Sequence, residues 1–329
     1  GVRLGAIIER RPAAIIVLFT GRLASELPAL SAGLTDSSLR IQPSLDGPRV
    51  LPMVLFGTVR DAGPLIPAGW PRNDRPRVLD GRSFSGRVDL VQDGVPTYNV
   101  VAEIPGADSA LAGTYVAFGA HLDHIGIQPP DHGDSIANGA DDDGSGSMAL
   151  IAMANKAKHE ARTKRSLLFV WHTGEELGLF GSEWFTSHPV VPIDSIVAQL
   201  NVDMIGRNDP DSLYLIGPRS APNGQSTVLG AIVDSVNSAS SRPFLINRDW
   251  DAPTHPEQLY YRSDHYNYAK HGIPIVFFTT GLHADYHRVT DTADKIDYDK
   301  LSRVAELILK AGQAVANSPT RPLPAALLR

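Results

Sequence analysis

The stretch SLLFVWHTGEELGLFGS, residues 166–182, joins a short apolar run to a glutamate-rich segment, in which we expect a helix to begin at Glu175. The same alternation continues on both sides of it. The predicted strands cover residues 98–104, 114–120, 166–172, 196–206 and 274–280, and the predicted helices cover residues 145–161 and 302–316. Strands that alternate with helices favour an α/β fold with functional residues on loops at strand ends.

The first 95 or so residues have a different pattern. It predicts a helix at residues 2–9 and strands at 14–19, around 50–56 and at 86–91. Proline and glycine crowd residues 63–82, which is typical of loops. We therefore expect a small β-rich accessory region over residues 1–95, a junction near residues 93–97 and a larger domain over residues 96–329.

The composition excludes several classes of function. The net charge of -6, without a basic stripe, argues against nucleic acid as a partner. No apolar run approaches the roughly 18 residues of a membrane span. Because cysteine is absent, a metal would have to be held by His, Asp and Glu. The chain starts at Gly1 without methionine, so we expect a processed or trimmed chain whose export signal was removed.

Two polar segments follow or precede predicted elements. GAHLDHIG (119–126) comes directly after a strand and is either a surface loop or a metal site, with His121 as ligand and Asp123 orienting its ring. NGADDDGSGS (138–147) leads into a helix. Its three aspartates either cap that helix or share a cation, since adjacent like charges repel.

Three further segments carry acidic residues or histidines. The paired glutamates of GEELG suit a helix N-terminus, but on a helix they would point about 100° apart. One could then bind a metal while the other acts as a general base. Asp203 lies in an apolar strand, where a buried carboxylate needs a partner such as a metal. His283 and His287 are either ligands or solvated loop residues.

Together these residues form an oxygen and imidazole set that suits zinc, with cobalt or manganese as substitutes. The run HLDH…GADDDGSGS…GEELGLFGS…NVDMIG…SDHYNYAKHGIP…DYHRVTDT resembles the zinc-dependent aminopeptidases of peptidase family M28 over residues 98–316. The resemblance implies a mixed β-sheet flanked by helices on both faces, the zinc exopeptidase fold. The block around Ser263–His265 is also typical of the family, although the spacing assigns it no role.

The resemblance also implies how the site is divided. One zinc would be held by His121 and Asp203, the other by Glu176 and His287, with Asp142 bridging the two. Glu175 would be the general base, and Tyr286 would stabilise an oxyanion. The peptide bond between Asp142 and Asp143 would be cis.

The amino-terminal region resembles part of a protease-associated (PA) domain, on the pattern GAIIERRPAAIIVLF followed by LPMVLF. If this resemblance holds, the first catalytic element and half of the accessory domain lie upstream of Gly1. By family resemblance we expect a secreted or periplasmic protein. The sequence specifies no oligomeric state.

The expected function is that of an aminopeptidase acting on peptides with a free N-terminus. One alternative is a dipeptidase or carboxypeptidase of the same family, although nothing in the spacing directs Arg207, Arg262 or Lys270 inward to bind a substrate carboxylate. Another is an acyltransferase resembling glutaminyl cyclase, with one zinc, which the complete ligand set disfavours. A non-catalytic binding module is disfavoured because neither a ligand nor the base is missing.

Overall fold

The computed structural model describes residues 14–19, 53–58, 96–131, 133–217, 227–252 and 254–322. The chain divides into two compact units, residues 1–94 and 95–329. In the first unit, strands β1 (Ala14–Phe19) and β2 (Met53–Thr58) pair in parallel, which confirms the strand predicted at 14–19. The helix predicted at residues 2–9 and the strand predicted at 86–91 lie outside the described residues.

The second unit is built on a seven-stranded sheet with the order β10-β9-β11-β8-β4-β7-β3. Its strands are β3 (Val100–Ile104), β4 (Tyr115–His121), β7 (Ser166–His172), β8 (Ile196–Val202), β9 (Ser212–Ile216), β10 (Leu245–Asn247) and β11 (Ile275–Thr279). The pairs β3–β7 and β9–β11 are antiparallel, and the other neighbours are parallel. This mixed sheet confirms the predicted α/β class.

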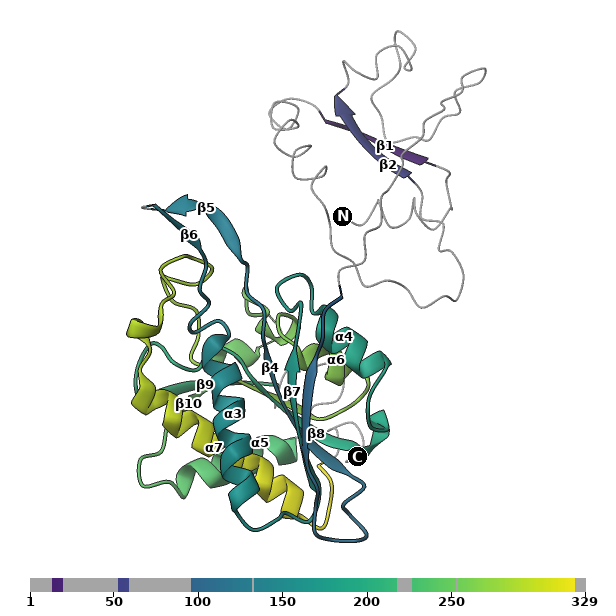
Figure 1. Cartoon of the computed structure of the whole chain (residues 1–329), viewed down its shortest axis with the longest axis vertical. Coiled ribbons are helices and arrows are strands. Elements are labelled where there is room, and N and C mark those ends of the chain that lie inside the picture. The colour runs from purple at the N-terminus through teal and green to yellow at the C-terminus, as the bar shows by residue number, and fades with distance from the viewer. Residues whose placement is uncertain are drawn as a thin grey trace. The chain divides into compact units, whose positions relative to one another are not determined.

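Helices cover both faces of the sheet (Figure 1). One face carries α3 (Gly144–His159), α5 (Thr227–Ser238) and α7 (Tyr298–Asn317), and the other carries α4 (Phe180–Ser187) and α6 (His265–Lys270). The alternation of side chains along β7 divides the core accordingly. Leu167 and Phe169 belong to one buried apolar cluster, and Leu168 and Val170 belong to the other. Both faces of the sheet are therefore sealed from water, as parallel strands require.

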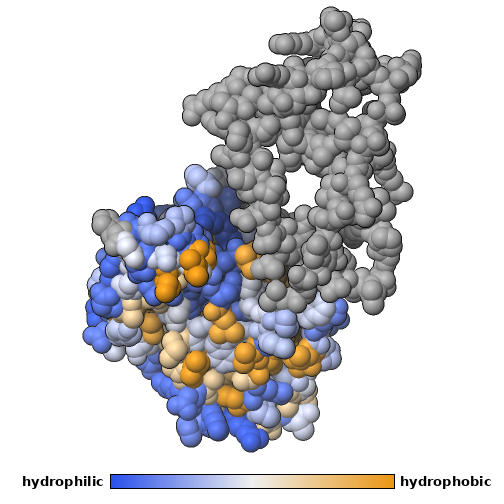
Figure 2. Space-filling model, turned by 45° about the horizontal axis from the view of Figure 1, so that its top comes forward, coloured by the Kyte–Doolittle hydropathy of each residue, from blue (hydrophilic) through white to orange (hydrophobic). Residues whose placement is uncertain are grey.

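The remaining elements are short. Strands β5 (Ile127–Asp131) and β6 (Asp134–Ile136) form a separate hairpin, and the 3-10 helices are η1 (Ile193–Ser195), η2 (Asp249–Asp251), η3 (Leu259–Tyr261) and η4 (Ala293–Lys295). No helix among the described residues has the length and apolar character to cross a membrane. On the face shown in Figure 2, apolar residues are scattered in small groups among hydrophilic ones.

Two predicted element boundaries are wrong. The helix expected at Glu175 begins only at Phe180, because Gly174 and Gly178 adopt positive φ angles of 65° and 117° and turn the chain before it. The strand expected over residues 196–206 ends at Val202, since Met204 has a φ of 59° and leaves the extended conformation. Both glutamates and Asp203 therefore lie in loops.

The sheet brings these loops to one edge. Strands β4, β7, β8 and β11 run in the same direction, so their carboxyl ends meet on the same side. His121 is the last residue of β4, and Asp203 directly follows β8. The glutamate turn follows β7, and the segment with His287 follows β11. Strand pairing thus brings residues that are far apart in the sequence to the same edge of the sheet.

Candidate metal centre

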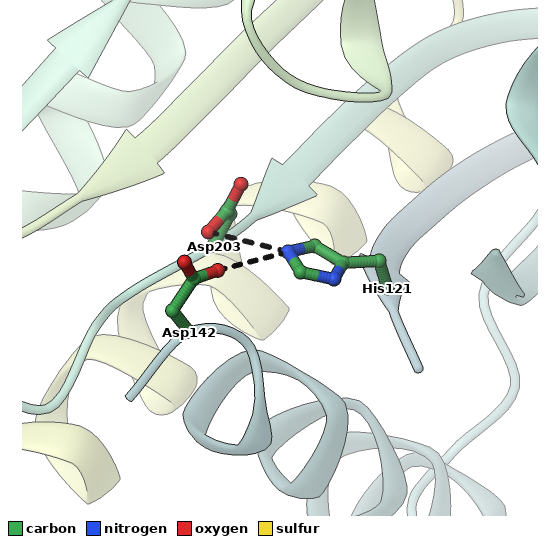
Figure 3. Close-up of side chains that lie close together, drawn as sticks. All are labelled: His121, Asp142 and Asp203. Carbon is green, nitrogen blue, oxygen red and sulfur yellow. Dashed lines mark ion pairs between the residues drawn. The ribbon is translucent and has the colours of Figure 1, made fainter. Parts of the chain in front are cut away.

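His121 faces two carboxylates at the end of β4 (Figure 3). Its Nδ1 donates a hydrogen bond of 2.9 Å to the backbone carbonyl of Asp123, so the lone pair lies on Nε2. That Nε2 is 3.2 Å from Oδ1 of Asp142 and 3.7 Å from Oδ1 of Asp203, yet it makes no hydrogen bond among the described residues. A buried lone pair aimed at two carboxylates is the arrangement expected around a cation.

Of the three adjacent aspartates, only Asp142 turns its carboxylate toward histidines on both sides. The side chains of Asp141 and Asp143 accept hydrogen bonds from backbone amides, and Asp143 also caps α3. Asp142 presents Oδ1 to Nε2 of His121 and Oδ2 to Nε2 of His287, each at 3.2 Å. The peptide bond Asp142–Asp143 is cis, as the family resemblance implied.

A second group of potential ligands gathers around Oδ2 of Asp142. Nε2 of His287 is 3.0 Å from Oε2 of Glu176. His124, which the sequence analysis did not single out, places Nδ1 2.8 Å from Oε1 of Glu176 and 3.8 Å from Oδ2 of Asp142. The only sequence signal for it is its position in the HLDH run.

The described residues thus contain two groups that could hold a metal, His121–Asp142–Asp203 and His124–Asp142–Glu176. Oε1 of Glu176 and both ring nitrogens of His124 also lack hydrogen-bond partners among the described residues. Imidazole nitrogens and carboxylate oxygens are the donors that zinc takes in the absence of cysteine. The residues present therefore fit zinc.

Asp123 differs from its predicted role. Its carboxylate lies 3.9 Å from Nδ1 of His121, and the backbone carbonyl of the same residue makes the hydrogen bond instead. The carboxylate accepts hydrogen bonds from the backbone amides of Glu175 (3.0 Å) and Glu176 (3.2 Å), which the turn before α4 leaves unpaired. Asp123 therefore orients the glutamate pair as well as the histidine.

Glu175 is buried beside the first group, with Oε2 4.0 Å from Nε2 of His121. Burial raises the pKa of Glu175 well above its usual range, and the neighbouring carboxylate of Asp203 adds to this, although His121 opposes it. Burial also tends to raise the pKa of Asp142, but the imidazoles of His121 and His287 beside its carboxylate hold that pKa well below its usual range. The two carboxyl groups are thus tuned in opposite directions, Glu175 toward holding a proton and Asp142 toward staying charged.

A cavity opens over these carboxylates. Its lining includes Glu175 and Asp203, and an apolar wall of Met204, Trp250, Leu259, Phe277 and Leu282. Ser263, whose role the spacing left unassigned, donates a hydrogen bond of 2.7 Å to Oδ2 of Asp203. A polar, acidic end therefore adjoins an apolar one.

Tyr286 and Arg262 line the same cavity. The Tyr286 ring stacks on His287 with centroids 3.9 Å apart, and Arg262 donates a hydrogen bond of 3.2 Å to its hydroxyl. The spacing gave no direction for Arg262, but in the fold it directly follows η3 and lines this cavity. The guanidinium also pairs with Glu257 at 2.8 Å, so part of its charge is offset.

The other two basic candidates and His283 lie apart from the ligands. Arg207 pairs with Asp285 at 2.6 Å, and Lys270 lies over the ring of Tyr266. Nε2 of His283 is 3.2 Å from Oδ2 of Asp141, outside both potential metal groups. Of the two histidines that the spacing left open, only His287 joins Asp142.

Asp291 holds the loop that carries Asp142. Its Oδ2 accepts hydrogen bonds from the backbone amides of Asp141 (3.0 Å) and Asp142 (3.2 Å), and its side chain is fully buried. The segment that carries His287 is thereby tied to the segment that carries Asp142. Sequence reasoning missed this residue, since only the folded chain brings the two segments together.

Comparison with known proteins gives one family. The model described as "Peptidase family M28" matches residues 99–312. Among curated proteins, "Probable leucine aminopeptidase 1" of Trichophyton verrucosum is 28% identical over 64% of this chain and 56% of its own length. "Probable leucine aminopeptidase 2" of Aspergillus oryzae is 31% identical over 59% of this chain and 36% of its own length. The chain therefore spans less than two thirds of either relative.

Solved structures share the fold. An aminopeptidase from Aneurinibacillus sp. strain AM-1 superposes with a TM-score of 0.52 at 25% identity, over 69% of this chain and 49% of that one. Porphyromonas gingivalis glutaminyl cyclase superposes with a TM-score of 0.51 at 20% identity, over 65% of this chain and 76% of that one. Because both chemistries use this fold, the side chains at the sheet edge have to distinguish them.

Replacing Asp291 by alanine should weaken metal binding, because the loop that presents Asp142 loses two hydrogen bonds. Loss of such a supporting partner typically costs about 10–100-fold in metal affinity. Zinc affinity would be measured by competition with a chelator. Asp285→Ala is the matched control, since Asp285 and Asp291 both pair with Arg207 but Asp285 contacts neither amide. Equal affinity in the Asp291 and Asp285 variants would contradict the anchoring role.

Proposed function

Because the chain belongs to peptidase family M28, we propose that it is a zinc-dependent aminopeptidase with two metal ions. One observation carries this proposal: Asp142 directs one carboxylate oxygen to His121 and the other to His287, each at 3.2 Å. In the proposal His121 and Asp203 hold one ion, Glu176 and His287 hold the other, and Asp142 bridges them. A cyclase-like site with one zinc would not need a complete ligand set on both sides.

The chemistry requires a general base and a way to stabilise an oxyanion. When bound, the zinc ions would lower the pKa of water and polarise the scissile carbonyl. Glu175 would take the proton of the attacking water on its carboxylate and pass it to the leaving amine. Its burial and raised pKa support this role, because a base poised to hold a proton can also return it.

Tyr286 would donate a hydrogen bond from its hydroxyl group to the developing oxyanion. Arg262 supports this role, since its N–H bond fills an acceptor position on the Tyr286 oxygen at 3.2 Å and leaves the hydroxyl hydrogen available. The stacking of Tyr286 on His287 keeps the phenol beside the proposed ligands.

The polarity of the cavity supports an aminopeptidase. The carboxylates of Glu175 and Asp203 suit a free α-amine, and the apolar wall suits a large apolar side chain at the substrate's N-terminus. The alternative is a dipeptidase or carboxypeptidase, in which Arg262 would receive a substrate carboxylate. Because Arg262 already pairs with Glu257, its guanidinium would bind a substrate carboxylate only weakly.

We also propose the wider organisation that the sequence implies. Residues 96–329 would form the catalytic domain, and residues 1–95 would be part of a PA domain. Two parallel strands in that region, β1 and β2, are compatible with this assignment. A secreted or periplasmic location follows from the family resemblance.

Glu175→Gln should keep the metal ions and the fold but lose most turnover, because it removes a proton acceptor and retains the side-chain size. Loss of a general base typically lowers turnover by about 10²–10⁴-fold. The rate of hydrolysis of leucyl-4-nitroanilide would be measured together with the zinc content. Glu176→Gln is the matched control and should lower the zinc content. If both variants lost zinc equally, the division of roles between the two glutamates would be wrong.

The enzyme should also require a free α-amine on its substrate, because the acidic end of the cavity can bind an amine but repels a carboxylate. Leucyl-4-nitroanilide would be compared with its N-acetylated form and with an N-blocked peptide that has a free C-terminus. We expect rapid cleavage of the free-amine anilide alone. Cleavage of the blocked peptide from its carboxyl end, with the anilide untouched, would establish the carboxypeptidase alternative instead.

A further inference from the structure

His124 lies inside the proposed cage but outside the five ligands that the family resemblance implies. It follows β4 in the loop 122–126, and its side chain is 9% exposed. Nδ1 of His124 is 2.8 Å from Oε1 of Glu176 and 3.8 Å from Oδ2 of Asp142. The ring meets that of His287 edge to face, with centroids 5.6 Å apart. His124 and His287 thus approach the same two carboxylates from different directions.

Nδ1 of His124 and Oε1 of Glu176 form a close, buried pair at 2.8 Å. Neither Nδ1 of His124 nor Oε1 of Glu176 has a hydrogen-bond partner among the described residues, despite their separation of 2.8 Å. A buried imidazole nitrogen and carboxylate oxygen at this distance need a cation between them, either a proton or a metal ion, and both atoms are donors that zinc accepts. Nε2 of His121 likewise lacks a partner among the described residues and faces Oδ1 of Asp142 at 3.2 Å on the other side of that carboxylate.

The neighbouring backbone is shaped to admit this ring. Gly139, in the loop that leads to Asp142, has a φ of 61°, and a Cβ there would lie 2.6 Å from Cγ and 2.9 Å from Cβ of His124. Any side chain at residue 139 would therefore displace the imidazole from the two carboxylates. The same Cβ would lie 2.4 Å from the backbone oxygen of Asp142, so glycine at residue 139 lets both the Asp142 backbone and the His124 ring approach this loop.

We propose that His124 is an additional zinc ligand, which binds the ion on the Glu176–His287 side through Nδ1. This inference rests on the proposed two-metal site. That ion would have protein ligands from Asp142, Glu176, His287 and His124, whereas the other would have only those from His121, Asp142 and Asp203. Closed four-ligand sites hold zinc firmly, and three-ligand sites keep a position for substrate or water. The two ions would then differ, and Glu175 lies beside His121, a ligand of the more open one.

The test measures metal binding without relying on turnover. Zinc affinity of wild-type protein and His124→Ala would be compared by chelator competition, and both proteins would be loaded with cobalt for visible absorption spectra. Loss of a residue that only supports a ligand typically lowers metal affinity by about 10–100-fold. We expect His124→Ala to lose at least as much affinity for one ion, because it removes a ligand. Its cobalt spectrum should change, because a donor nitrogen is removed. Leu122→Ala, in the same loop but with an exposed side chain, is the control.

A second measurement uses the wild-type chain, in case His124→Ala fails to fold. Long-range ¹H–¹⁵N spectra of the histidine rings, recorded with and without zinc, should show the Nδ1 resonance of His124 moving to a metal-bound position. An unmoved resonance, or an unchanged cobalt spectrum in the variant, would overturn the proposal and leave His124 as a neighbour of Glu176. Wild-type protein that binds fewer than two zinc ions would instead contradict the proposed function.

Discussion

The structure depends on the compensation of buried negative charge at one edge of the sheet. The side chains of Asp142, Glu175, Glu176 and Asp203 are each no more than 10% exposed, and each lies within 4.0 Å of a histidine ring nitrogen. Buried carboxylates without partners are too costly to persist, and imidazoles can offset only part of the charge. Divalent cations would compensate the remaining negative charge and would also supply the Lewis acid that hydrolysis needs.

The scaffold keeps the cluster together through backbone geometry. Parallel strands deliver His121 and Asp203 to the same edge, while supporting carboxylates hold the loops between them. Asp123 accepts hydrogen bonds from the backbone amides of Glu175 and Glu176, and Asp291 accepts them from the backbone amides of Asp141 and Asp142. Each supporting residue ties together segments distant in sequence. The site is therefore a property of the whole α/β unit.

The sequence was informative about the sheet and the residue types, and less so about loop geometry. Apolar runs such as residues 114–120 and 166–172 predicted β4 and β7 closely, because strands buried on both faces are short continuous runs of apolar residues. Where strands end could not be predicted, since that depends on single residues such as Met204 with its positive φ. Spacing also could not choose Asp142 among three aspartates. In the fold, Asp141 and Asp143 differ from Asp142 because their side chains accept hydrogen bonds from backbone amides.

The most direct test of this account is a crystal structure of zinc-loaded protein with diffraction data collected on both sides of the zinc absorption edge. The account predicts two anomalous peaks, one on each side of the Asp142 carboxylate and about 3.5–4 Å apart, as in other two-metal hydrolases. A single peak, or peaks that leave Asp142 without contact to both ions, would contradict it.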